Sequence, residues 1–236
     1  MNNNIISSTL VPDKIQSDTV IVACSRVQQE LSHAISSTGC DYPVILLKSR
    51  LHDVPENLNA ALQDIIDELS ALGIKRILMG YATCGNALAG LHSRQCELIF
   101  PRCDDCVTFF LGSMKRRREM PTGIFYITSD WATDKTYGLH EYQNMVEEYG
   151  EEMAQEVYEM MFEHYRYAGI LDTTCCPTDT FRPEAEQFAA QMELDVIDID
   201  GSNDWLTQLL TGPWPKERFF CFTAGYQITA NDLYLP

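Results

Sequence analysis

Short runs of apolar, β-branched residues alternate along this chain with amphipathic segments, and this alternation limits the folds open to the chain more than any other feature. The run TVIVAC at residues 19–24 is typical of a strand buried on both faces of a parallel sheet. Residues 57–72 carry apolar side chains at helical spacing, and Gly73 follows them as a helix cap often does. Strands that alternate with helices predict an α/β fold with a mostly parallel sheet.

The rest of the chain continues this pattern. Further strands are expected at residues 43–47, 76–81, 97–100, 123–128, 170–173, 195–200 and 218–223, and further helices at residues 27–35, 106–120, 140–168, 183–192 and 205–210. The helix at 140–168 is expected to be long and acidic. We therefore predict a Rossmann-like sheet with helices on both faces. Because no linker rich in Pro, Gly or Ser divides the chain, residues 17–236 are expected to form a single domain after a flexible segment at 1–16.

The composition bears on partners and location. The 236 residues carry a formal net charge of −17, which argues against nucleic acid and anionic membrane surfaces as partners. No apolar stretch approaches the roughly 20 residues that cross a bilayer. The N-terminus also lacks the basic and apolar regions of a signal peptide. These features predict a cytoplasmic protein.

The nine cysteines are many for a cytoplasmic chain, in which thiols stay reduced and disulfides are rare. In open α/β sheets, ligands bind beyond the carboxyl ends of the strands. Six of the nine cysteines follow the end of an expected strand: Cys24, Cys84, Cys103, Cys106, Cys175 and Cys176. Cys40 and Cys96 precede strands, whereas Cys221 lies within an apolar strand and is expected to be buried.

The strand-end cysteines have the chemistry of metal ligands. Thiolate is the form that binds metals, and helix N-termini lower the pKa of a thiol. Cys106 is expected to begin a helix, and Cys84 precedes Gly85 and Asn86, which allow a tight turn and a close approach of the backbone to a bound group. Three thiolates can hold zinc, or an iron–sulfur cluster with one open iron. We therefore predict that Cys24, Cys84 and Cys106 bind zinc or an iron–sulfur cluster.

Other interpretations of these residues stay open. A buried cysteine usually serves as a small apolar side chain. Cys103 and Cys106 have the spacing of a redox pair, but Pro and Gly are missing between them. Asp105 can cap the helix that follows it or act as a base beside a substrate. No GxGxxG, GxxxxGK[ST], GxSxG or HExxH motif is present, so a nucleotide cofactor is not supported.

Several longer segments carry a resemblance to a known family. The segments GYATCGNALAGL, PRCDDCVTFFLGS and GIFYITSDW, with VIVACSRVQQEL and HYRYAGILDTT, resemble a bacterial and archaeal family known as domain of unknown function 1638. The residues that match the family pattern are Cys24, Cys84, Asn86, Asp105, Cys106, Gly112 and Ser113. The differences are Asp104, where the family often has His, Ser129-Asp130 in place of Pro-Gly, and the additional Cys103, Cys175 and Cys176.

The resemblance has functional implications. It implies a core site of Cys24, Cys84 and Cys106. Members of the family often occur near corrinoid-dependent methyltransferase systems, which implies a setting in one-carbon or methylamine metabolism and a methyltransferase or corrinoid protein as partner. The corrinoid-binding DxHxxG pattern is absent, so the chain is not expected to carry cobalamin itself.

Two functional hypotheses follow. In the first, the protein binds a metal or cluster that acts on a small substrate as a Lewis acid. Asn86, Asp105 and Ser113 then orient the substrate, and Gly85 and Gly112 lie against the bound group. In the second, it is a non-catalytic accessory protein or metal carrier that docks on a corrinoid methyltransferase system. A pocket favours the first hypothesis, and an exposed apolar patch favours the second. The chain is also a candidate homo-oligomer.

Overall fold

The computed structural model describes residues 6–10, 17–133 and 139–235. The chain divides into two compact units, Met1–Met114 with Asn203–Pro236 and Lys115–Ser202, and each has its own sheet. Nine α-helices lie in the described residues and most strand pairs are parallel, so the expected α/β class is confirmed. The sequence pattern predicts one domain at 17–236, whereas the chain forms two compact units, and β6 (Ile124–Ile127) pairs with β7 (Tyr167–Asp172) in a second sheet.

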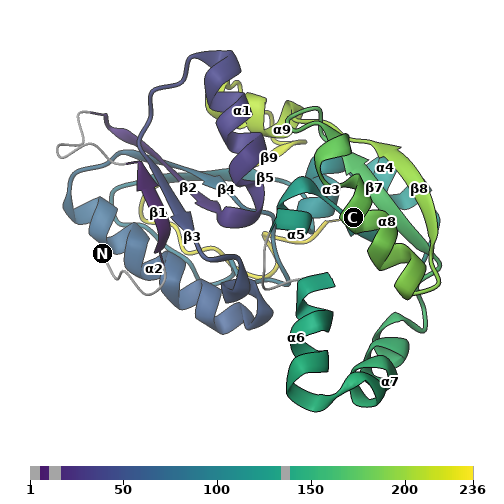
Figure 1. The fold of residues 1–236 in the computed structure, drawn as a ribbon. Helices are drawn as coiled ribbons and strands as arrows, with labels where there is room; N and C mark the ends of the chain where they lie inside the picture. The colour runs from purple at the N-terminus through teal and green to yellow at the C-terminus, as the bar shows by residue number, and fades with distance from the viewer. Residues whose placement is uncertain (1–5, 11–16, 134–138, 236) are drawn as a thin grey trace. The chain divides into compact units, whose positions relative to one another are not determined.

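The larger sheet has six strands in the order β1-β3-β2-β4-β5-β9 (Figure 1). Its four central strands are parallel, namely β3 (Val44–Leu47), β2 (Thr19–Cys24), β4 (Arg76–Gly80) and β5 (Glu97–Pro101). Two antiparallel strands form its edges, β1 (Ile6–Leu10) and β9 (Phe219–Phe222). Because β2, β4 and β5 are parallel neighbours, the residues that follow them emerge at one edge of the sheet.

Helices cover both faces of this sheet (Figure 1). On one face, α1 (Gln28–Thr38) packs on α9 (Asp204–Thr211). On the other face, α2 (Pro55–Ala71) starts with a proline, which suits the first helical position. The buried apolar residues of α2 recur at three- and four-residue spacing and pack against the sheet: Leu58, Leu62, Ile65, Ile66 and Leu69. Burial on both faces explains why the central strands are almost continuously apolar.

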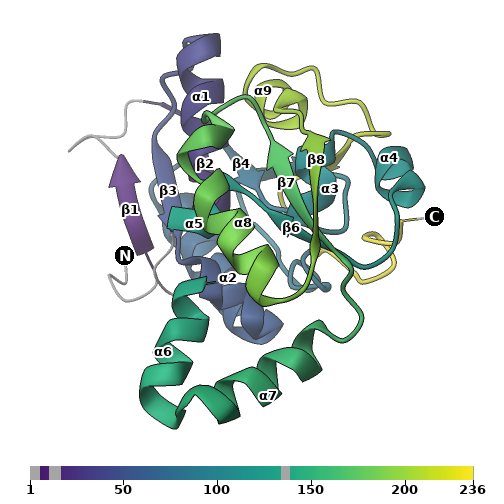
Figure 2. The same ribbon diagram turned by 45° about the vertical axis from the view of Figure 1, so that its right-hand side comes forward.

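The smaller unit has a parallel sheet of three strands, β6, β7 and β8 (Asp195–Asp200), in that order. Its helix α8 (Arg182–Gln191) packs against β7 and β8 (Figure 2). An aromatic cluster fills its core, in which the rings of Phe125 and Phe162 are 5.1 Å apart. The short helices α4 (Met114–Glu119) and α5 (Ser129–Thr133) flank β6 in the sequence.

Two expected long helices are interrupted at glycines. The segment 140–168 forms α6 (Leu139–Tyr149) and α7 (Glu151–Phe162), and its last residues enter β7. Gly150 separates the two helices with a φ of 87°. The segment 106–120 likewise forms α3 (Cys106–Leu111) and then α4, because Gly112 adopts a φ of 79°. A positive φ suits glycine and ends a right-handed helix.

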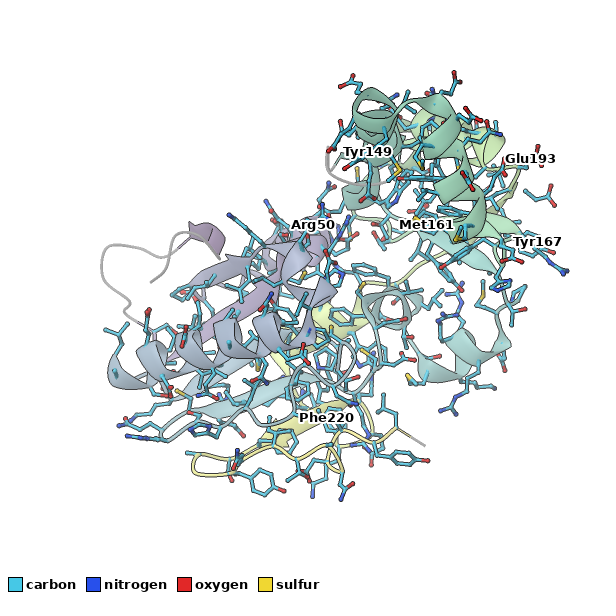
Figure 3. All side chains as sticks on the ribbon, turned by 90° about the horizontal axis from the view of Figure 1, so that it is seen from below. Arg50, Tyr149, Met161, Tyr167, Glu193 and Phe220 are labelled. Atoms are coloured by element: carbon cyan, nitrogen blue, oxygen red, sulfur yellow. The ribbon has the colours of Figure 1, made fainter. Side chains whose placement is uncertain are left out.

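The edge strands account for two further differences from the expectation. Within the segment expected to be flexible, Ile6–Leu10 pairs with β3 as β1, whereas residues 1–5 and 11–16 lie outside the described residues. The edge strand β9 buries Phe219 and Phe220 but not the residue that follows them. Phe220, labelled in Figure 3, is buried with its ring 5.2 Å from that of Phe100. Cys221 is exposed, so the expectation that it is buried was wrong.

No described helix has both the length and the apolar character that a membrane span needs.

Candidate functional site

A pocket of about 330 Å³ lies at the carboxyl ends of β2 and β4 in the larger unit. Its wall comes from the end of β2, the segment after β3, the turn after β4 and the start of α3. Three cysteines belong to this wall: Cys24, Cys84 and Cys106. The structure therefore brings the three predicted metal ligands into one pocket, as the neighbouring positions of β2, β4 and β5 require.

Each of the three thiols reaches the pocket from a different segment. Cys24 is the last residue of β2 and is half-buried. Cys84 lies in the turn after β4, and Cys106 is the first residue of α3, which follows β5. None of the nine cysteines, all of which are among the described residues, forms a disulfide.

The turn that carries Cys84 has an unusual backbone. Cys84 and Asn86 have φ values of 46° and 67°, and Gly85 between them also has a φ of 67°. The turn is held against the loop before α3, because the N–H of Cys84 donates to the carbonyl of Asp104 at 3.1 Å and the N–H of Thr83 donates to that of Cys103 at 3.0 Å. Non-glycine residues with positive φ are costly and cluster at functional sites.

Burial and neighbouring groups raise the pKa of two pocket thiols, Cys84 and Cys106. The pKa of Cys84 is raised to about 12, chiefly by burial and then by the neighbouring Cys24. Burial also raises the pKa of Cys106, with further contributions from Cys84 and Asp105, whereas Arg26 lowers it. Cys106 is accessible to solvent. Accessibility and burial are compatible here, because a pocket wall can meet solvent on one side and be surrounded by protein on the others.

Asp105 lines the pocket and also caps α3. Its Oδ1 accepts a hydrogen bond from the backbone N–H of Thr108 at 2.7 Å. A carboxylate in this position satisfies a free backbone donor and favours the start of the helix. The same side chain can therefore cap the helix and face a molecule bound in the pocket.

The other predicted residues divide into two groups. Gly85 forms part of the pocket wall, but Asn86, Gly112 and Ser113 do not. Gly112 instead ends α3.

None of the additional cysteines is among the described residues that line the pocket. Cys103 is fully buried and is not part of the pocket wall, and burial raises its pKa. Cys175 and Cys176 belong to the smaller unit.

The arrangement of donors bears directly on metal binding. In the described ranges, no group of three or more His, Cys, Asp or Glu side chains is arranged to hold a metal ion. The three pocket thiols have the soft-donor chemistry that suits zinc and iron. An ion would require them to converge and to lose their protons.

Four further side chains of the pocket wall were not predicted from the sequence. Tyr81, Arg26, Lys48 and His52 line the pocket. Tyr81 and Lys48 directly follow β4 and β3, so the rule that ligands bind beyond strand ends applies to them as well. The burial of the Tyr81 side chain raises its pKa, and Cys24 and Cys84 raise it further.

Comparison with known proteins identifies the family of the chain. Residues 46–210 match the sequence profile of a family described as "Protein of unknown function (DUF1638)". This match covers more than half of the chain and includes Cys84, Asp105 and Cys106, whereas Cys24 precedes it. No curated protein and no solved structure matches the chain. The chain belongs to the DUF1638 family, as the resemblance of its strand-end segments predicted.

Proposed function

We propose that the protein binds a thiophilic metal ion or an iron–sulfur cluster through Cys24, Cys84 and Cys106, in a Rossmann-like unit. One observation carries the proposal: three thiols from separate segments of the chain line one pocket at the carboxyl ends of parallel strands. Soft thiolates select zinc and iron over magnesium and calcium.

The electrostatics of the pocket support this assignment. Burial disfavours the ionised forms of Cys84 and Cys106, and ionised neighbours repel one another. A bound cation reverses both effects, because it compensates the charge and deprotonates the coordinating thiol. The raised pKa values of Cys84 and Cys106 therefore describe the protein without an ion.

A metal with an open position would supply Lewis-acid chemistry in this pocket. Among the residues expected to orient a substrate, Asp105 lines the pocket, whereas Asn86 and Ser113 do not. We therefore assign the orientation of a substrate to Asp105. Gly85, which also lines the pocket, lets the backbone approach a bound group closely.

The presence of a pocket also favours a small ligand over the docking of a partner protein. A cavity of about 330 Å³ is of the size that small molecules occupy. The family resemblance supplies the metabolic setting of the proposal, which is one-carbon or methylamine metabolism in the cytoplasm. A role as a metal carrier for a corrinoid methyltransferase is the alternative.

A cobalt titration tests the proposal. Protein purified without oxygen should contain zinc or iron, and the metal-free protein should bind Co²⁺ with the intense near-ultraviolet absorption of thiolate ligands. A Cys40→Ser variant serves as the control, because Cys40 is not part of the pocket wall. Protein that contains neither metal and develops no thiolate absorption with cobalt contradicts the proposal.

A further inference from the structure

The buried hydroxyl of Tyr81 lacks a hydrogen-bond partner. Tyr81 lines the pocket and is only 3% exposed. Its Oη makes no hydrogen bond within the described part of the chain. Buried polar groups are almost always paired, so each exception calls for an explanation. The missing partner of a hydroxyl on a pocket wall is explained if a bound ligand supplies the hydrogen-bond acceptor.

Positive charge lies on the same wall. Arg26 and Lys48 both line the pocket, and Lys48 makes no ion pair within the described residues. Among the described residues of this wall, Asp105 is the only one with a carboxylate, and its Oδ1 already accepts a hydrogen bond from the backbone N–H of Thr108. His52 also lines the pocket, but its Nε2 lies 3.4 Å from the carboxylate of Asp53. Cations that gather in a chain of net charge −17 indicate an anionic ligand.

The rest of the wall is largely apolar, and the pocket is small. Val27, Leu58 and Phe109 contribute hydrocarbon surface to a volume of about 330 Å³. This lining suits a compact hydrocarbon body better than a polyphosphate or a nucleotide. The ligand that fits carries one anionic group, a short apolar body and an oxygen acceptor.

We propose that this pocket binds a small organic acid, with its carboxylate facing Arg26 and Lys48 and one of its oxygens accepting a hydrogen bond from Tyr81. The inference rests on the proposed function because it names the class of molecule that would share the pocket with the metal. The cationic side chains supply the counter-charge, and Tyr81 acts as a positioning residue. The charge and the hydroxyl can be tested one at a time.

Calorimetric titrations of the full chain with acetate, butyrate and hexanoate test the inference, with butyramide as the neutral match for butyrate. Each is measured once with zinc and once with EDTA. At least one acid should bind, and butyrate should bind at least about tenfold more tightly than butyramide, since hydrogen bonds to charged groups are the stronger ones.

Two variants separate the contributions of charge and hydroxyl. Lys48→Gln should weaken the binding of the acid by up to about fivefold, as the loss of an exposed charge pair does. Tyr81→Phe should also weaken it about fivefold, through the loss of one hydrogen bond. Tyr81→Phe should in addition raise the melting temperature of the ligand-free protein, because it removes a buried hydroxyl without a partner. Lys75→Gln and Tyr234→Phe, both outside the pocket wall, should change none of these values.

Three results would overturn the inference. They are binding of no acid more tightly than butyramide, unchanged binding in both Lys48→Gln and Tyr81→Phe, and a Tyr81→Phe variant that loses affinity for zinc but not for butyrate. The last result would show that the hydroxyl of Tyr81 interacts with the metal-binding thiolates and not with the acid. If the acids bind with this dependence in EDTA while the protein takes up no metal, the metal proposal fails and the present inference stands.

Discussion

The two sheets both carry cysteines just beyond the carboxyl ends of their strands, but the surroundings of these cysteines differ. In the larger unit, Cys24, Cys84 and Cys106 come from three segments and line one pocket. In the smaller unit, Cys175 and Cys176 are consecutive residues after a single strand, β7. A strand-end cysteine becomes part of a shared site only where neighbouring strands also place donors at the same edge.

The thiols of the smaller sheet interact locally. The Sγ of Cys175 donates to the carbonyl of Thr173 at 3.2 Å, and the Sγ of Cys176 lies 3.4 Å from the Oγ1 of Thr180. For Cys84 and Cys106 in the larger unit, burial is the main cause of a raised pKa. Packing around the thiol therefore distinguishes the two regions.

The strands show the same contrast. β2 and β3 are buried along almost their whole length, because helices cover both faces of the larger sheet. β8 is an edge strand that exposes most of its residues, including Asp195, Asp198 and Asp200. Parallel strand pairs occur in both sheets, and in the larger unit burial raises the pKa of two pocket thiols, Cys84 and Cys106.

The largest expected effect separates the two groups of cysteines by their affinity for metal. Cys84→Ser should weaken the binding of cobalt at least about a hundredfold, because serine is a poor ligand for soft metals and even the loss of an outer-shell partner weakens metal sites up to that extent. Cys176→Ser should leave the affinity within about twofold. Competition titrations with a chelator measure both values. If Cys176→Ser loses the metal and Cys84→Ser keeps it, the site is in the smaller unit.

A second effect, smaller when taken per thiol and per pH unit, concerns the pH dependence of metal affinity. Cys84 has a pKa raised to about 12, so it carries a proton at neutral pH that a metal ion must displace. Affinity for zinc should therefore rise as the pH increases from 6 to 8, by about tenfold per pH unit for each thiol that loses its proton. Zinc competition assays at several pH values measure the slope. Cys84→Ser should lower the slope by one proton, and an affinity independent of pH would contradict thiol ligation.

The smallest expected effect concerns two cysteines that do not lie at the carboxyl end of a strand, Cys96 and Cys221. Cys96 is fully buried, and its Sγ lies 3.2 Å from both the Oγ of Ser70 and the carbonyl of Ile74. Cys96→Ala should lower the free energy of unfolding by about 1–2 kcal/mol, since it removes buried volume and a hydrogen bond. Cys221→Ala, at an exposed site, should change it by less than about 0.5 kcal/mol. Urea denaturation measures both, and equal losses would show that exposure does not separate these cysteines.

Most strands were predictable because their signal is local. The apolar runs at 19–24 and 76–81 became β2 and β4 with almost the expected bounds. The helix breaks at Gly112 and Gly150 were missed, because helical spacing of apolar residues continues across a glycine that turns the backbone. The second sheet was also missed, since a run of apolar residues carries no record of which other strand it pairs with.

The candidate site follows the same division. Local sequence is enough to show that Cys24 ends a strand, that Cys84 follows one and that a helix begins at Cys106 after Asp105, because these signals depend on neighbouring residues. Strand order alone brings these segments to one pocket, and packing alone buries the hydroxyl of Tyr81 there without a partner. Strand pairing and burial join residues far apart in the chain, and such contacts exist only after the chain has folded.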